Sequence, residues 1–171
     1  MPTGIETTRR FATPIGVVEA VATPKGLRRV RFLRPDERDS RDESEALEGP
    51  ATAQAHLARF AECLPAFLAG TARAFRGVKL DLPPMTPFRR EIYKQLRRIG
   101  PGRTVSYGEL AELAGRPGAA RAVGSAMSQN PVALVQPCHR VLAAGGRIGG
   151  FSPSVSIKRR LLELEGAYEL S

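Results

Sequence analysis

The chain has 171 residues, enough for one sizeable hydrophobic core or two small lobes. Hydrophobic residues make up 42% of it, which argues against global disorder, and no apolar run approaches the roughly 18 residues of a membrane span. The net charge is +9, and residues 86–171 carry most of the excess, with 13 basic but only 6 acidic side chains. A basic half of this kind favours nucleic acid as a partner, because phosphate contacts supply most non-specific affinity.

The cysteines and histidines are too scattered for a structural metal site. Cys63 and Cys138 form no close-spaced pair, and His56 and His139 are no better grouped. Residues 1–10 are polar and are followed by no apolar block, so no secretory signal is visible. We expect a cytoplasmic protein that binds no metal and no other cofactor and does not enter a membrane.

Short strands open the chain. They are predicted over 10–12, 17–22 and 27–33, with a Thr-Pro-Lys-Gly turn between the last two. This pattern indicates a small sheet with a hairpin. The segment 34–50 that follows alternates in charge and has few apolar residues, so we expect a solvated loop without a function.

A helix is predicted over 51–68, and it ends at a glycine. Residues 72–82 then return to strand or irregular structure. A proline pair follows and marks the predicted boundary between a first domain, 1–84, and a second domain, 85–171.

The second domain is mostly helical. Apolar residues recur every four positions over 87–99, after a threonine N-cap and a first-turn proline. Ser106 and Glu109 are spaced as a capping box that opens a helix over 107–114. A tight Gly-Arg-Pro-Gly turn precedes a third helix over 119–129. Two short helices joined in this way predict a helix-turn-helix.

The third of these helices is slim, because alanine and glycine fill much of it, and Arg121 is its only charged residue. Small residues allow a helix backbone to approach a DNA groove closely, although they are also typical of close packing between helices. A protein that reads base sequence in the major groove would present several long polar side chains. The helix therefore suits contact with DNA shape or with the minor groove.

The segment Val135–Val141 places a lone cysteine, Cys138, beside His139 and Arg140 after an apolar, strand-like run. A thiol reacts as the thiolate, and cationic or hydrogen-bonding neighbours lower its pKa. The alternative is a buried cysteine that ends a core strand, with Arg140 in solvent. On an extended segment adjacent side chains point apart, so His139 would not easily contact the sulfur directly.

Four motifs in one order, 102–107, 119–127, 130–131 and 137–141, closely resemble the O6-alkylguanine-DNA alkyltransferases, also called methylated-DNA-protein-cysteine methyltransferases. The resemblance is strong over about 86–166. It implies an α+β fold, in which the N-terminal half is similar to the family's ribonuclease-H-like lobe. A mostly helical lobe with a helix-turn-helix of the winged-helix type would follow.

The resemblance also assigns the chemistry. Cys138 corresponds to the residue that accepts the alkyl group from O6 of guanine, after which the protein is spent. His139 would act through a bound water, oriented by Glu165. Arg121 resembles the arginine that fills the space left by a flipped base, and Tyr107 matches the tyrosine that turns the flanking phosphate and donates to the leaving base.

Further residues correspond to the DNA-binding surface and to the substrate pocket. Phe151 replaces a common tyrosine and Pro153-Ser154 a frequent glycine pair, so the substrate loop is expected to be stiffer than usual. Asn130 would tie the recognition helix to the cysteine loop, and Ser152 would donate to O6. The implied DNA contacts are Tyr107, Arg121, Ser106, Ala119, Ala120 and Gly124, and the implied pocket is Tyr107, Met127, Asn130, Val141 and Ser152.

The implied partner is double-stranded DNA that contains O6-alkylguanine, with O4-alkylthymine as a further candidate substrate. We expect a monomer, located in the cytoplasm or, in a eukaryote, in the nucleus. One alternative is a non-catalytic protein that only binds alkylated DNA, but such proteins carry a different residue in place of Cys138. Two further alternatives are a cysteine hydrolase and a DNA-binding regulator. A cysteine hydrolase would need an oxyanion hole.

Overall fold

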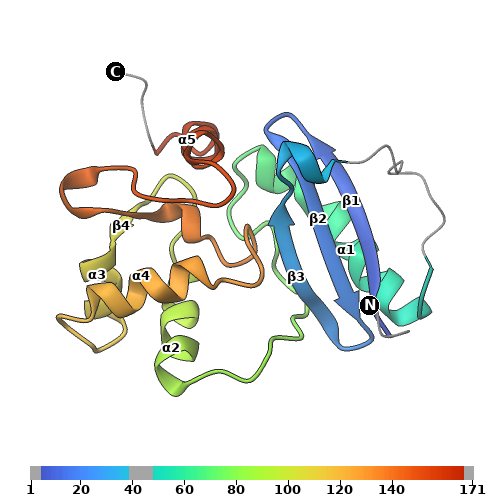
Figure 1. Cartoon of the computed structure of the whole chain (residues 1–171), viewed down its shortest axis with the longest axis horizontal. Coiled ribbons are helices and arrows are strands. Elements are labelled where there is room, and N and C mark those ends of the chain that lie inside the picture. The colour runs from blue at the N-terminus through green and yellow to red at the C-terminus, as the bar shows by residue number, and fades with distance from the viewer. Residues whose placement is uncertain (1–4, 39–47, 168–171) are drawn as a thin grey trace.

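The computed structural model describes residues 5–38 and 48–167. The α+β class is confirmed: a small antiparallel sheet with its covering helix lies on one side of the molecule, and the remaining helices lie on the other (Figure 1). Residues 39–47 of the predicted charged loop lie outside the described part. Its beginning forms a 3₁₀ turn at Pro35–Glu37.

The sheet has the order β1-β2-β3, with strands β1 (Thr7–Thr13), β2 (Gly16–Thr23) and β3 (Gly26–Phe32). The predicted hairpin between β2 and β3 is confirmed, and β1 begins earlier than expected. Because side chains alternate between the faces of a strand, one face carries apolar residues, while the other carries arginines and Glu19.

The helix predicted over 51–68 is confirmed as α1 (Ala51–Leu68). Its buried residues, among them Leu57 and Phe60, pack against the apolar face of the sheet. The segment that follows contains no strand: an isolated bridge between Leu80 and Leu27 and an ion pair between Asp81 and Arg28 join it to β3.

Three helices follow, α2 (Pro87–Leu96), α3 (Tyr107–Leu113) and α4 (Ala120–Ser128). The predicted end of α2 at Ile99 is wrong. The helix ends at Leu96, and the chain then tightens into a turn, in which the N–H of Arg98 donates to the carbonyl of Gln95 and the N–H of Ile99 to the carbonyl of Leu96.

The predicted capping box at the start of α3 is present. The backbone N–H of Glu109 donates to Ser106 Oγ at 3.0 Å, and the backbone N–H of Ser106 donates to Glu109 Oε2 at 2.7 Å. α3 and α4 pack together as the predicted helix-turn-helix. The packing reading of the slim helix is confirmed for one face of α4, where Val123 and Ala126 are buried in the core, and Arg121 lies exposed outside it.

The last part of the chain differs most from expectation. The run before the cysteine is not a strand: it forms turns, and the cysteine lies in a 3₁₀ turn, Cys138–Arg140. A short parallel pair, β4 (Val105–Ser106) with β5 (Val141–Leu142), was not predicted, nor was α5 (Val155–Leu164). A second 3₁₀ turn lies at Ala144–Gly146. These elements rest on long-range contacts, which local patterns do not reveal.

α5 connects the two sides of the molecule. Its buried residues Ile157 and Leu161 belong to the hydrophobic cluster between the sheet and α1, together with Val132 and Leu134 from the segment before the cysteine. A second cluster lies among α2, α3 and α4 and reaches Cys138. The cysteine segment is therefore held between the two clusters, which restricts its movement.

Candidate active site and DNA-binding surface

A cavity of about 670 Å³ lies between the sheet and the helix-turn-helix, and Cys138 is part of its wall. The cysteine is partly exposed, whereas Cys63 is buried in α1. Most of the residues predicted for the pocket also line this cavity, as does Gly124 from the predicted DNA surface. The predicted residues in the wall are Tyr107, Gly124, Met127, Asn130, Cys138 and Ser152.

Behind Cys138 lies a buried group of three polar side chains. His139 Nε2 is 2.8 Å from Glu165 Oε1, and the side chains of both residues are almost fully buried. Arg140 donates from Nη2 to Glu165 Oε1 at 2.7 Å and from Nε to Oε2 at 3.0 Å, and its Nη1 donates to the carbonyl of Ile99. Glu165 therefore holds the imidazole in one orientation, and Arg140 holds Glu165.

Arg140 is one of two residues whose role sequence reasoning missed. The alternative expectation, that the Arg140 side chain lies in solvent, is wrong: the side chain is 8% exposed and forms an ion pair with Glu165. Cys138 and His139 do not lie on an extended segment, as the sequence suggested, but in a 3₁₀ turn. His139 Nδ1, the ring nitrogen that Glu165 leaves free, is buried and has no partner among the described residues.

Burial and pairing shift the pKa values of this group. Burial lowers the pKa of His139, although the hydrogen bond that the imidazole donates to Glu165 opposes the change. Burial alone would raise the pKa of Glu165, but the hydrogen bonds from His139 and Arg140 outweigh it and hold that pKa below its ordinary value. At neutral pH the pair is thus a neutral imidazole and a carboxylate, and the imidazole is able to accept a proton.

The buried His139 should make stability depend on pH. Below the ordinary histidine pKa of about 6.5 the unfolded chain binds a proton that the folded chain does not, so stability falls as the pH falls. We expect a loss of at most about 1.4 kcal/mol between pH 7.5 and 5.5, seen in urea unfolding. A His56→Gln variant, which leaves His139 as the only histidine, should lose the same amount. Equal stability at the two pH values would contradict the assignment.

The thiol itself is not ionised by its surroundings. Burial raises the pKa of Cys138, while an interaction with the Asn130 side chain and the positive charge of Lys158 partly offset this. The sequence suggested that cationic neighbours would lower the thiol pKa, and the net direction is the opposite. A nucleophile in this site therefore needs a base that takes the thiol proton as the reaction proceeds.

Lys158 is a second residue that sequence reasoning missed. It is 1% exposed on α5, and its Nζ donates to the carbonyls of Val141 at 2.7 Å and Gly150 at 3.3 Å. Burial lowers its pKa to about 8. Lys158 thus joins the cysteine segment to the loop that carries Ser152. Its position next to Ile157 in the apolar stripe of α5 is the signal that would have placed it in the interior.

Asn130 connects the end of α4 to the cysteine segment. Its Nδ2 donates to the carbonyl of Gln136 at 2.8 Å, and its Oδ1 accepts from the Gln136 side chain at 2.9 Å and from the backbone N–H of Val132 at 3.1 Å. Gln136 is fully buried. These bonds fix the distance between the helix-turn-helix and Cys138.

The remaining predicted residues lie around the mouth of the cavity or beyond it. Arg121 is exposed near the N-terminus of α4, and Ala119 and Ala120 precede it; none of the three lines the cavity. The Ser106 hydroxyl caps α3. Val141, the remaining residue of the predicted pocket, accepts at its carbonyl from Lys158, and this oxygen retains one lone pair.

Tyr107 reaches across to the loop before Phe151. A Cβ atom at Gly149 would lie 3.5 Å from its hydroxyl, and the φ of +70° at Gly149 also favours glycine. Burial raises the pKa of Tyr107, so its phenol is protonated and available as a hydrogen-bond donor at neutral pH.

Within residues 5–38 and 48–167, no three or more His, Cys, Asp and Glu side chains gather in a way that would hold a metal ion. No helix in the same two segments has the length and apolar character needed to cross a membrane. The arrangement is that of a DNA-binding domain with a cysteine and a buried histidine–glutamate pair at a cavity beside its helix-turn-helix.

Comparisons with known proteins identify this arrangement. Residues 87–167 match the family model for the 6-O-methylguanine DNA methyltransferase DNA-binding domain. A methylated-DNA–protein-cysteine methyltransferase of Methanosarcina acetivorans is 37% identical over 161 residues, which are 92% of this chain and 96% of the relative. The chain belongs to the methylated-DNA–protein-cysteine methyltransferase family.

The comparison with solved structures supports the same family. The crystal structure of Mycobacterium tuberculosis OGT in complex with DNA is similar with a TM-score of 0.75 at 35% identity, covering 93% of this chain and 92% of that one. A Methanococcus jannaschii O6-methylguanine DNA methyltransferase gives a TM-score of 0.59 at 27% identity, with 95% of each chain covered. The similarity thus extends over the N-terminal sheet as well as the helix-turn-helix.

Proposed function

We propose that this protein repairs duplex DNA by moving the alkyl group of O6-alkylguanine to the sulfur of its own Cys138, once per molecule. The observation that carries the proposal is the placement of a partly exposed cysteine in a cavity beside the helix-turn-helix, with a buried His139–Glu165 pair behind it. The relatives named above are methyltransferases of this type, and one similar structure contains DNA.

In the proposed reaction the Cys138 sulfur attacks the alkyl carbon, a new C–S bond forms, and the bond from that carbon to O6 breaks. The thiol proton passes through a water to His139, whose positive form Glu165 stabilises. The electron pair of the broken bond remains on guanine, and Tyr107 donates a hydrogen bond to the leaving base. This order suits a thiol whose pKa burial raises, because the proton leaves only as the substrate reacts.

The lesion must leave the base stack to reach the cavity. We assign Arg121 to the space vacated by the flipped nucleotide, with Ala119, Ala120, Ser106 and Gly124 along the same DNA-facing surface. Met127, Asn130, Val141 and Ser152 are assigned to the pocket. We further propose that the protein is a monomer with two lobes, 1–84 and 85–171. It would act in the compartment that contains the DNA.

The direct test is the intact mass of the protein after incubation with a duplex that contains O6-methylguanine, under reducing conditions. We expect the mass of one methyl group to be added per chain, and peptide mapping to place it on Cys138. An unmodified duplex is the control. If the protein mass stays unchanged with the methylated duplex, the proposed function is wrong.

Arg121→Ala should slow repair of duplex DNA far more than it slows the reaction with free O6-benzylguanine, because only the duplex requires base flipping. Flipping costs a few kcal/mol, so we expect a loss of about tenfold or more in duplex repair. Single-turnover rates on the two substrates measure the difference. Equal slowing of both reactions would show that Arg121 has no part in flipping.

A further inference from the structure

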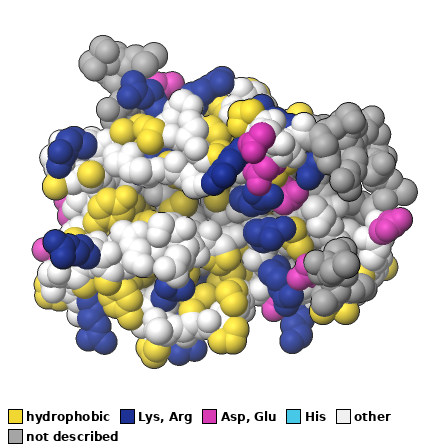
Figure 2. Space-filling model, viewed as in Figure 1, with side chains coloured by type: hydrophobic (Ala, Val, Ile, Leu, Met, Phe, Trp, Pro, Cys, Tyr) yellow, Lys and Arg dark blue, Asp and Glu magenta, His cyan; other side chains and the backbone are white. Residues whose placement is uncertain are grey.

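The N-terminal sheet contributes one side of the cavity that contains Cys138. Its contribution comes from the end of β3 and the 3₁₀ turn after it, and includes two arginines and one glutamate: Val30, Arg31, Phe32, Arg34 and Glu37. Figure 2 shows basic and acidic side chains gathered over the strands of the sheet, beside the part of the molecule formed by the helix-turn-helix. Of these, Arg34 and Glu37 lie in the segment 34–50, for which the sequence predicted no function.

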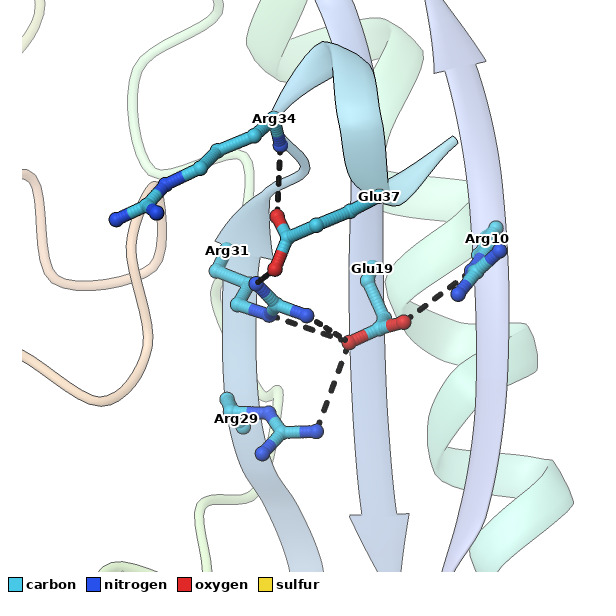
Figure 3. Close-up of polar contacts among 6 residues, drawn as sticks. All are labelled: Arg10, Glu19, Arg29, Arg31, Arg34 and Glu37. Atoms are coloured by element: carbon cyan, nitrogen blue, oxygen red, sulfur yellow. Dashed lines mark hydrogen bonds and ion pairs between the residues drawn. The ribbon is translucent and has the colours of Figure 1, made fainter. Parts of the chain in front are cut away.

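Arg31 is held in place on both sides. Its strand position is directly opposite Glu19, which is almost buried, and the two side chains are 3.1 Å apart. Its Nη1 donates to Glu37 Oε1 at 2.7 Å. Arg10 and Arg29 approach the same Glu19 at 3.2 and 3.5 Å (Figure 3). The charge of Arg31 is therefore compensated, and the contact with Glu37 fixes the 3₁₀ turn to the sheet.

Arg34 differs from Arg31. Only its backbone N–H contacts Glu37, at 2.8 Å, and no ion pair joins its guanidinium to a carboxylate of the described residues. The residue is exposed and also lines the cavity. Figure 3 shows its side chain extending away from the carboxylates of Glu19 and Glu37. The turn thus presents, at the mouth of the cavity, a positive charge that no direct ion pair with a described residue neutralises.

We propose that Arg34 binds a backbone phosphate of the lesion-bearing strand, so that the N-terminal sheet and the helix-turn-helix hold that strand from opposite sides of the cavity. The inference rests on the proposed function. A base that reaches Cys138 leaves its sugar and phosphates at the mouth, where Arg34 lies. A guanidinium fork suits phosphate oxygens, and the Glu19–Arg31–Glu37 chain acts as the support that positions it.

The test compares Arg34→Ala with Arg29→Ala, an exposed arginine on β3 that does not line the cavity. For Arg34→Ala we expect affinity for a methylated duplex to fall about five- to tenfold, and the log-log salt slope to become shallower by about 0.9, the value for one phosphate. Arg29→Ala should change neither quantity. Arg34→Lys should restore the salt slope, because it restores the charge.

Transfer from a methylated duplex at limiting protein concentration should slow much more than transfer from free O6-benzylguanine, which has no phosphate. An unchanged salt slope would overturn the inference. Equal slowing with both substrates would also overturn it and would place Arg34 against the base instead. Binding and its salt slope do not require transfer. A wild-type protein that binds the methylated duplex without taking up a methyl group would therefore refute the proposed function and still test Arg34.

Discussion

Replacing Cys138 by alanine should abolish alkyl transfer and leave binding to duplex DNA nearly unchanged. The sulfur is the only atom of the residue that the proposed reaction consumes, whereas the proposed DNA surface consists of the exposed face of α4 and the surrounding arginines. The side chain is small and partly exposed, so its loss removes little packing. Intact mass after incubation with a methylated duplex measures transfer, and fluorescence anisotropy measures binding.

A Cys63→Ala variant is the matched control, because Cys63 is the other cysteine of the chain and is buried in α1, away from the cavity. It should retain transfer. If Cys138→Ala loses affinity for DNA together with transfer, the cysteine segment is needed to shape the DNA surface, and the proposed division between binding and chemistry would have to be abandoned.

Glu165→Gln should have the second large effect, on both stability and rate. The substitution leaves the buried Arg140 without its anion, and breaking a buried pair in this way costs about 3–5 kcal/mol. It also removes the charge that stabilises protonated His139, so the transfer rate should fall by about 100-fold. Urea unfolding and single-turnover transfer to the protein measure the two effects.

The matched control for this prediction is Glu163→Gln in the last turn of α5, because Glu163 forms no ion pair with any residue of the described segments. Its Oε1 is buried without a hydrogen-bond partner, so removal of the charge there should not destabilise the fold. The double variant Arg140→Met with Glu165→Gln separates the two effects. It should regain part of the stability, since no unpaired charge remains, but none of the rate. Recovery of the rate in the double variant would show that Glu165 acts only through Arg140.

The cysteine segment shows how local patterns failed. Its apolar run before Cys138 has the composition of a strand, yet it forms turns, because Val132 and Leu134 fill the cluster under the sheet and Asn130 binds its backbone from the end of α4. A prediction from the composition of the segment alone does not take these interactions into account. Arg140 was misjudged for the same reason, since its partners Glu165 and Ile99 lie far away in sequence.

The sequence by itself determined the elements that depend on neighbouring residues: the three strands, α1, the capping box of α3 and the helix-turn-helix, all of which follow from side-chain periodicity and turn residues. Its ordered motifs also indicated the family. Only the tertiary structure decided how Arg140 and Lys158 are used and what Arg34 faces. Burial, charge compensation and the walls of a cavity are set by residues distant in the chain, and no local pattern contains them.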